Sequence, residues 1–417
     1  MVGSGFDGTR RRGGGACSRP GGATHRGTGG AHRPVPRTDD AQVRRVMGRA
    51  LRVAVIAPSR HPIRQPHPGG LEACVWERVR GLRARGHDVT LCGPDGSDFL
   101  DGPPEFVLPR PHWASDEEPS DTAYPRGYLG RIDDAMERAM GHLARHSDRF
   151  DVIDNHSLHG APIAWRDRVG IPMVTTLHTP PLPDMIAAAR STTGAEHRFL
   201  AVSRHTAREW DAAGVESMVF PNGVDTDRWT AGPGGDRWVW FGRIVPEKAP
   251  HLAIDAALLA GKRIVLAGRV GDAEYFETEV RPRLGAQARY VGALRQSALA
   301  RLVGRSAVAL VTPMWDEPFG LVLAETLATG TPLAAFDAGG VREVVAAAPG
   351  AMVVSRGDID SLALAAAELA ERSALEPGLR VQIRAAAVAQ FSLERRHAQL
   401  EGLLASVAVG AQRLEVA

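Results

Sequence analysis

The sequence predicts an α/β protein made of two consecutive domains, each a parallel sheet covered by helices. The first observation is length, because 417 residues are more than one ordinary hydrophobic core requires. The second is a pattern, from Leu51 onward, in which short continuous apolar runs alternate with stretches of helical spacing. Such apolar runs are typical of strands buried on both faces of a parallel sheet.

Composition favours a soluble globular protein, with 44% hydrophobic and 24% charged residues. Three cysteines, Cys17, Cys74 and Cys92, form no C-x-x-C pair and cannot all be bridged. This usage indicates a reducing compartment without a cysteine zinc site, so we expect a cytoplasmic protein. No apolar run approaches the roughly 20 residues that a membrane-spanning helix needs.

Residues 1–49 differ from the rest of the chain. They carry 10 Arg and 3 Asp, a net charge of +7 against +2 for the whole chain, which leaves −5 for the remainder. They are rich in Gly, Pro and Thr, so we expect a disordered basic extension rather than an arm that binds nucleic acid. No apolar segment follows the arginines, which argues against a signal peptide. Translation starting at Met47 is the simpler alternative, in which case residues 1–46 are not part of the protein.

Residues 50–230 are expected to form the first domain. A predicted helix over Leu71–Arg85 ends at Gly86, and 95–125 should be an irregular surface excursion. The predicted strands are Leu51–Ala57, His87–Gly93, Asp151–Asn155, Ile171–Thr176 and Phe199–Ser203.

Residues 231–392 are expected to form the second domain, after a turn-rich segment. Its predicted strands are Trp238–Phe241, Arg263–Ala267, Ala288–Val291, Ala307–Val311 and Pro332–Phe336, and its helices are 249–260, 273–284, 296–304 and 319–328. The carboxyl ends of both sheets should face a shared cleft, where ligands bind in such sheets. Residues 358–410 should be helical, and the last helix, 393–417, is a candidate for packing back on the first domain.

The strongest chemical signal is the segment from Glu317 to Glu325, which follows a predicted strand. Pro318 suits the first turn of a helix, so the helix should begin here with its free amides and positive dipole end in the cleft. Glu325 lies eight residues after Glu317, about two turns further on a similar face. Two carboxylates with amides between them suit a ligand with hydroxyls at both ends and phosphate in the middle. The alternative is that Glu317 only favours the helix dipole and Glu325 is a surface acid.

A second group of residues suited to ligand binding follows the first strand of the second domain. Gly242 allows a ligand to approach the backbone, and Arg243 and Lys248 could converge on a diphosphate. The chain has only two lysines, Lys248 and Lys262, which mildly favours a specific role for the first. A solvated pair of loop cations is the alternative.

Two weaker signals lie in the first domain. Gly69-Gly70 opens a predicted helix and offers amides to an anion, although the G-x-G-x-x-G of dinucleotide-binding proteins is absent. His178 ends a strand beside the cleft. A simple turn and an ordinary loop histidine are the respective alternatives.

Two metal-like patterns have simpler explanations. Asp225-Thr226-Asp227 has the D-x-D form of a metal site but lies in the interdomain turn, where capping or turn chemistry explains it better. His156 and His159 have no third ligand at suitable spacing, so we expect acceptor-pocket or structural roles. We therefore expect no metal.

In order along residues ~51–350, these elements resemble the retaining GT-B glycosyltransferases of family 4, which have two Rossmann-like domains facing a central cleft. The matching segments are Gly69-Gly70, His178, Val202-Ser203, Pro221–Asp225, Gly242-Arg243 with Lys248, Tyr290–Gly292, the E-x7-E of Glu317 and Glu325, Gly330–Pro332, and Gly339-Gly340 with Glu343. Each is weak alone, and chance co-occurrence is improbable.

The resemblance implies roles for these residues. Arg243 and Lys248 would neutralise the donor diphosphate in place of a metal, and Glu325 would bind the ribose hydroxyls. Glu317 would bind the sugar hydroxyls, helped by the amides of Phe319 and Gly320, and Leu321 is a further donor-binding residue. Residues 293–295, with Leu294 at the centre, would flank the base. Gly70 would contact the phosphates from the opposite domain, with Gly69 as a further donor-binding residue, and His178 would lie near the sugar and the leaving group.

The implied activity is transfer of a hexose-type sugar, with retention, from a nucleotide diphosphate sugar to an unidentified hydroxyl acceptor. Uridine is expected from family frequency, and no cofactor beyond the donor co-substrate is expected. The expected partners are donor and acceptor, without nucleic acid, and a peripheral membrane contact stays open. Asp154 stands where relatives often have histidine, and Ala293 where they often have a polar residue or histidine, so the resemblance does not identify the acceptor or the base. The alternatives are a GT-B epimerase or phosphorylase and a non-catalytic nucleotide-sugar-binding protein.

Overall fold

The computed structural model describes residues 49–117, 120–121, 123–191 and 196–414, with side chains as far as residue 410. All of the described residues belong to a single compact unit. The predicted disordered extension therefore lies outside the described residues, apart from Arg49, and Met47 lies outside them too.

Residues as far as 230 build the first sheet, and we call them the first lobe. All its strands are parallel, in the order β3-β2-β1-β4-β5-β6-β7, so the chain winds outward in both directions from β1. The strands are β1 (Arg52–Ile56), β2 (Asp88–Pro94), β3 (Val107–Leu108), β4 (Val152–Asn155), β5 (Met173–Leu177), β6 (His197–Ala201) and β7 (Met218–Val219). The short β3 belongs to the segment predicted as an irregular excursion.

Helices cover both faces of this sheet because alternate strand side chains point to opposite sides. Val53 and Val55 of β1 pack with α2, while Ala54 and Ile56 pack with α3. The helices are α2 (Gly70–Ala84), α3 (Tyr128–Arg145), α4 (Gly160–Val169), α5 (Pro183–Ser191) and α6 (Arg204–Ala212), with short 3-10 turns η1 (Pro104–Phe106) and η2 (Ser147–Arg149).

Residues 231–392 build the second sheet, and we call them the second lobe. Its strands are also all parallel, in the order β10-β9-β8-β11-β12-β13. They are β8 (Trp238–Phe241), β9 (Ile264–Ala267), β10 (Ala288–Tyr290), β11 (Val308–Val311), β12 (Leu333–Phe336) and β13 (Ala351–Val354). The helical segments are η3 (Pro246–Lys248), α7 (Pro250–Leu259), α8 (Ala273–Tyr275), η4 (Phe276–Val280), η5 (Arg281–Arg283), α9 (Gln296–Gly304), α10 (Leu321–Ala328), α11 (Val341–Val345), α12 (Ile359–Leu375) and α13 (Leu379–Phe391).

One predicted helix of the second lobe is irregular. The segment predicted as a single helix over 273–284 is one turn of α-helix, then the π-helix η4, then the 3-10 turn η5. Pro282 supplies the reason, since it has no N–H to donate and its ring excludes the carbonyl of the preceding turn. The helical path survives, but its hydrogen-bond pattern changes.

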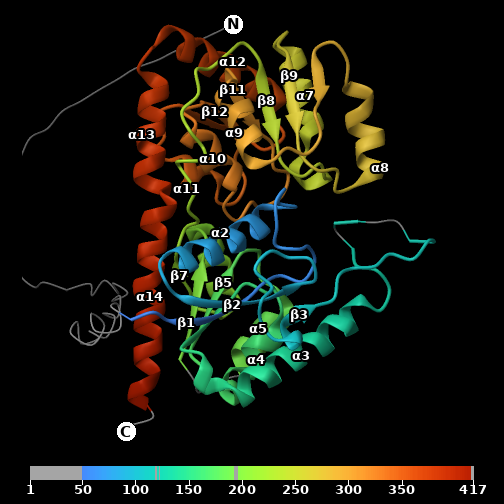
Figure 1. Cartoon of the computed structure of the whole chain (residues 1–417). Helices are drawn as coiled ribbons and strands as arrows, with labels where there is room; N and C mark the ends of the chain where they lie inside the picture. The colour runs from blue at the N-terminus through green and yellow to red at the C-terminus, as the bar shows by residue number, and fades with distance from the viewer. Residues whose placement is uncertain (1–48, 118–119, 122, 192–195, 415–417) are drawn as a thin grey trace, which may run out of the picture. The chain divides into compact units, whose positions relative to one another are not determined.

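The last helix, α14 (Leu393–Leu414), packs on the first lobe. Its Leu400 and Leu404 are buried in the same cluster as β1 and α2. The turn before the second lobe is tied to the start of α14, because Val224 N donates to Phe391 O at 2.7 Å and Leu393 N donates to Val224 O at 3.1 Å. Figure 1 shows α13 leading into α14, which runs beside the first sheet.

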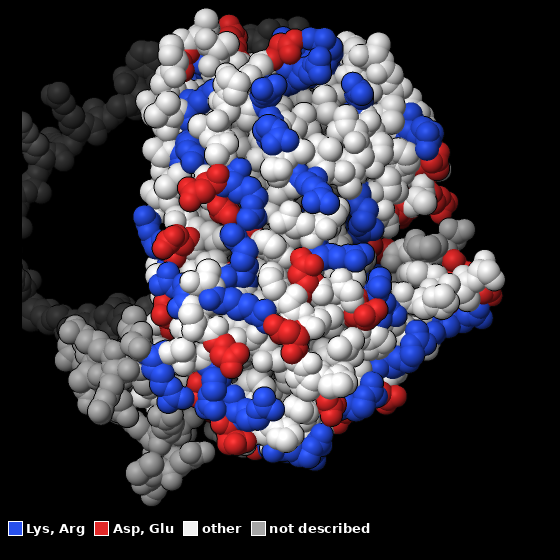
Figure 2. All heavy atoms as spheres, viewed as in Figure 1, with Lys and Arg blue, Asp and Glu red and all other residues white. Residues whose placement is uncertain are grey.

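Charge on the visible surface is mixed. Figure 2 shows basic and acidic side chains interspersed over one face, a distribution that gives no single large basic patch there. In the described ranges, no helix combines the length and apolar character needed to cross a membrane.

Candidate active site between the two lobes

Two glycines bring the first lobe against the second. Gly69 precedes α2 with extended backbone, and Gly70 is the first residue of the helix. A Cβ added at Gly69 would lie 3.7 Å from Arg243 Cδ, and one added at Gly70 would lie 3.2 Å from Leu321 Cδ1. The N-terminus of α2 therefore meets the N-terminus of α10 and the Arg243 side chain. Two positive helix ends and a guanidinium in one place favour an anionic ligand.

The loop before α10 takes a different form from the one predicted. The helix begins at Leu321 rather than 319, with Gly320 in the left-handed region (φ 75°), so Pro318 lies outside its first turn. The loop is held by the opposite Gly339-Gly340 pair. Gly340 N donates to Glu317 O at 2.7 Å, and a Cβ at Gly339 would lie 2.5 Å from that same oxygen. Tertiary contact with the two glycines, rather than the proline, sets where the helix starts.

Lys248 and Glu317 form a close ion pair. Glu317 also accepts a hydrogen bond from Trp315 Nε1 at 3.1 Å, and Lys248 Nζ lies 4.8 Å from the centre of the Trp315 ring. Glu317 is buried, so its charge is sheltered from water and depends on these partners. The two residues that were assigned to diphosphate and sugar are therefore neighbours. Trp315 was not singled out from the sequence.

Arg243 follows Gly242, whose φ of 156° is accessible mainly to glycine. Its guanidinium contacts Glu247 at 3.3 Å and Asp121 at 3.2 Å. Asp121 comes from the first-lobe excursion and also forms an ion pair with Arg269. Its carboxyl pKa is held below the usual range: burial raises it, and hydrogen bonds to His61 and Arg269 more than offset that effect. Asp121 was not among the site residues predicted from the sequence.

His178 is the end of a chain of polar groups in the first lobe. Its Nε2 lies 2.8 Å from Nδ1 of His156, and Nε2 of His156 lies 3.1 Å from Asp154. We assign the Nε2 proton of His156 to the side facing the carboxylate, which makes its Nδ1 the acceptor for His178. Burial is the largest cause that lowers the pKa of both histidines, followed for His178 by the neighbouring His156.

Asp154 is fully buried and stays ionised. Arg78 of α2 lies 3.6 Å from its carboxylate. Burial raises the pKa of Asp154, but Arg78 and His156 outweigh this and bring it to about 2. The residue that departs from the family pattern thus orients His156, and through it His178.

Glu325 lines a pocket between α2, the interdomain turn, α10 and α14. Glu77, Asn222 and Gln296 also line it. Among the described residues, no side-chain hydrogen bond or ion pair reaches Glu325. Burial, and secondarily the charge of Glu77, raises its pKa to about 8. A carboxyl without a partner in a pocket is available to a ligand.

The remaining residues predicted to bind the sugar donor differ in whether their side chains can reach a ligand. Phe319 is buried with its ring against Phe391, so only its backbone can face a ligand. Leu294 lies between β10 and α9 and packs on the second-lobe core, while Gln296, two residues later, lines the pocket of Glu325. Gln296 was not predicted, and its position just inside α9 was the available signal.

Residues of both metal-like patterns make hydrogen bonds or ion pairs with other parts of the protein. Asp225 accepts from the backbone N of Asp227 and of Arg228 at 3.1 Å and pairs with Arg80 at 2.9 Å, as expected for a turn residue. His159 caps α4 by accepting from Ala161 N at 3.0 Å.

Comparisons with known proteins agree with this geometry. The Glycosyltransferase Family 4 model matches residues 68–228, and the Glycosyl transferases group 1 model matches residues 233–388. A phosphatidyl-myo-inositol mannosyltransferase of Mycobacterium leprae is 25% identical over 397 residues, covering 88% of this chain and 100% of the relative. A D-inositol 3-phosphate glycosyltransferase of Jonesia denitrificans is 28% identical over 360 residues, covering 71% and 82%.

Solved structures show the same fold. Anabaena HepE in complex with UDP-glucose aligns with a TM-score of 0.66 at 18% identity, covering 85% of this chain and 100% of that one. Sucrose-phosphate synthase from Thermosynechococcus elongatus aligns with a TM-score of 0.67 at 18% identity, covering 86% and 100%.

Two parallel-sheet lobes with this motif order define a glycosyltransferase of the GT-B architecture, which confirms the predicted fold and enzyme class. Within that class, the chain belongs to the family 4-like glycosyltransferases.

Proposed function

We propose that this enzyme transfers a hexose-type sugar, with retention at the anomeric carbon, from a UDP-sugar to a hydroxyl acceptor. The observation that carries the proposal is the convergence of Arg243, the Lys248–Glu317 pair and the N-terminus of α2 at one place between the lobes. A fold neighbour that binds UDP-glucose supports a nucleotide-sugar donor, and relatives named as a mannosyltransferase and a glycosyltransferase support sugar transfer.

The cations of the second lobe take the place of a metal in this proposal. Arg243 and Lys248 would face the diphosphate, and Glu325 would accept from the ribose hydroxyls. The reaction breaks the bond between the anomeric carbon and the diphosphate oxygen, and the acceptor oxygen forms the new bond on the same face. The acceptor proton passes to the leaving diphosphate. Fixed cations stabilise the charge that develops on this leaving group.

The hydrogen-bonded series of side chains that ends at His178 would contact the sugar of the donor. With His156 oriented by Asp154, His178 donates its Nε2 proton to His156, and among the described residues no hydrogen bond reaches its Nδ1. A neutral imidazole at this place can accept a hydrogen bond from a sugar hydroxyl without adding charge beside the diphosphate.

The decisive experiment combines donor screening with product analysis. Thermal shift with UDP, GDP, ADP and CDP and their sugars identifies the base, because ligand at about 100 times Kd stabilises by about 2.7 kcal/mol. Proton NMR of the product then gives the anomeric configuration. Inversion would exclude the retaining mechanism. Nucleotide-sugar binding without donor hydrolysis at any enzyme concentration would favour a non-catalytic binding protein.

A further inference from the structure

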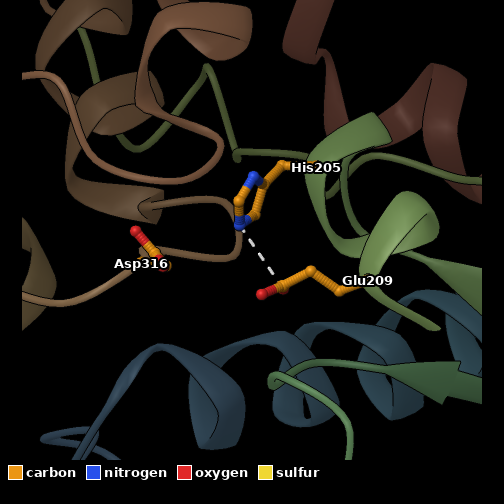
Figure 3. A group of neighbouring side chains, drawn as sticks. All are labelled: His205, Glu209 and Asp316. Carbon is orange, nitrogen blue, oxygen red and sulfur yellow. Dashed lines mark ion pairs between the residues drawn. The ribbon is translucent and has the colours of Figure 1, made fainter. Parts of the chain in front are cut away.

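A second cluster of ligand-type side chains lies where the lobes touch, apart from the diphosphate residues. His205 and Glu209 belong to α6 of the first lobe, and Asp316 precedes Glu317 in the second-lobe loop. One donor atom from each residue lies within 4.8 Å of the others. In Figure 3, Asp316 lies across from the His205–Glu209 pair, whose contact is marked.

The two helix residues are spaced to share one ligand. Positions i and i+4 lie on the same face of an α-helix, so both side chains extend toward the second lobe. Nε2 of His205 and Oε2 of Glu209 are 3.4 Å apart. Two ligands of a tetrahedral zinc-like ion, each about 2.0–2.1 Å from it, lie about 3.3 Å from each other. The observed separation therefore matches adjacent corners of a coordination shell.

The two donor atoms contact each other as an ion pair, but among the described residues neither has the hydrogen bonds that buried polar atoms normally make. Nε2 of His205 and Oε2 of Glu209 are shielded from solvent, and neither makes a hydrogen bond within the described part of the chain. Leaving such atoms unsatisfied is costly, and an ion between them would satisfy both. Asp316 pairs with Arg356 through one oxygen, which leaves its second oxygen for an ion.

The surroundings already hold the two lobes together at this place. Arg204 N donates to the Glu343 carboxylate at 2.8 and 3.0 Å, and Thr206 Oγ1 donates to Pro318 O at 3.4 Å. The cluster thus lies between docked surfaces. The donor atoms lie within 4.8 Å of one another, wider than the roughly 3.3 Å between ligands of one tetrahedral ion, so Asp316 must move toward the other two residues to bind it.

We propose that His205, Glu209 and Asp316 bind one divalent cation of the zinc class, which ties α6 to the loop that carries Glu317. One imidazole and two carboxylates suit Zn²⁺ or Co²⁺ better than Mg²⁺, which prefers oxygen alone. Three protein ligands leave the remaining position to water. The role is to stabilise the contact between the lobes, and it does not depend on the transferase assignment.

The test uses the full chain, stripped with EDTA and titrated with Co²⁺, whose visible d–d absorption reports the ligands directly. We expect one saturable site and, with Zn²⁺ at about 100 times Kd, a rise in Tm of about 3 °C. His205→Ala and Glu209→Gln should each weaken binding by about a hundredfold or more. His112→Ala, at an exposed histidine outside the cluster, should bind like the wild type.

Asp316→Asn separates a bridging site from one confined to α6. It should also weaken Co²⁺ binding and abolish the Tm rise. Unchanged binding in this variant would overturn the link between the lobes. Absence of a saturable Co²⁺ spectrum, or equal binding in all variants, would overturn the site itself and leave an ordinary His205–Glu209 ion pair. Circular dichroism checks that each variant is folded. If His205→Ala does not fold, the binding measured for Glu209→Gln tests the site by itself.

Discussion

Asp121 Oδ2 lies 3.2 Å from Nη1 of Arg243, although the two residues belong to different lobes. The Asp121 side chain is 4% exposed and pairs with Arg269 as well. A carboxylate thus contacts the cation that we assign to the donor diphosphate, and the two anions would compete for it.

Asp121→Asn should therefore strengthen UDP binding by about three- to tenfold, because a partly buried ion pair of this kind contributes about 1 kcal/mol. Isothermal titration calorimetry measures the change. Asp116→Asn is the matched control, since Asp116 pairs with Arg126 in an exposed position of the same excursion. Unchanged or weaker UDP binding in Asp121→Asn would show that the carboxylate positions Arg243 rather than competing for it.

Lys248→Ala should lower turnover by about a hundredfold, the usual cost of losing one group that stabilises transition-state charge. The chain supplies its own control, because Lys262 is its second lysine and is exposed. Lys262→Ala should retain the wild-type rate in the same steady-state assay. A Lys248→Ala enzyme that is folded and turns over almost normally would remove the main support for the proposed donor site.

The site shows which parts a sequence can predict. Strand ends carry Gly242 and His178 in the predicted places because apolar runs set the sheet. Asp121 was missed because its segment has no periodicity, and its burial depends on arginines more than 100 residues away. The predicted start of α10 was wrong because Gly339 and Gly340 hold the preceding loop. Such long-range contacts cannot be inferred from the helix propensity of the local sequence. The pairing of Lys248 with Glu317 likewise follows from two loops meeting in space.

Glu325→Gln should remove a pH dependence of UDP affinity. The Glu325 pKa is raised to about 8 by burial, so the carboxyl is largely protonated near neutrality. An ionised carboxylate accepts ribose hydroxyls more strongly, so wild-type affinity should rise as pH increases through about 8. Affinities measured from neutral to mildly alkaline pH should be flat in Glu325→Gln. Equal slopes in both proteins would contradict the ribose role.

The same shift predicts a change in stability with pH. Below the unfolded pKa of 4.5 both states of Glu325 are protonated, and the carboxyl adds no pH dependence. Between 4.5 and about 8 only the unfolded state releases the proton, so the free energy of unfolding should fall as pH rises, and the full penalty is present above 8. Denaturant unfolding should show a smaller decline for Glu325→Gln. Glu371→Gln, exposed on α12, is the control and should follow the wild type.

His178→Gln should lower kcat while leaving UDP affinity within about twofold, since His178 is assigned to the sugar rather than the nucleotide. Its lowered pKa, caused first by burial, keeps the ring neutral through the histidine range. The unfolded state therefore binds the extra proton, and stability should be lost as pH falls through 6.5. The variant should lose less stability over that interval. A parallel loss of UDP affinity would place His178 at the diphosphate instead.

EDTA should leave turnover within a fewfold of the untreated rate, because Arg243 and Lys248 supply the charge that a metal supplies in other transferases. The Asp225 carboxylate is engaged by Arg80 and by backbone amides, so the D-x-D pattern has little capacity for an ion. The interlobe cation proposed above would be stripped by the same treatment, which should lower Tm without abolishing the reaction. A different result would indicate a catalytic metal outside the His205, Glu209 and Asp316 cluster. In that case EDTA abolishes activity, and Mn²⁺ restores it both in the wild type and in His205→Ala. Asp225→Asn would then be the variant to measure.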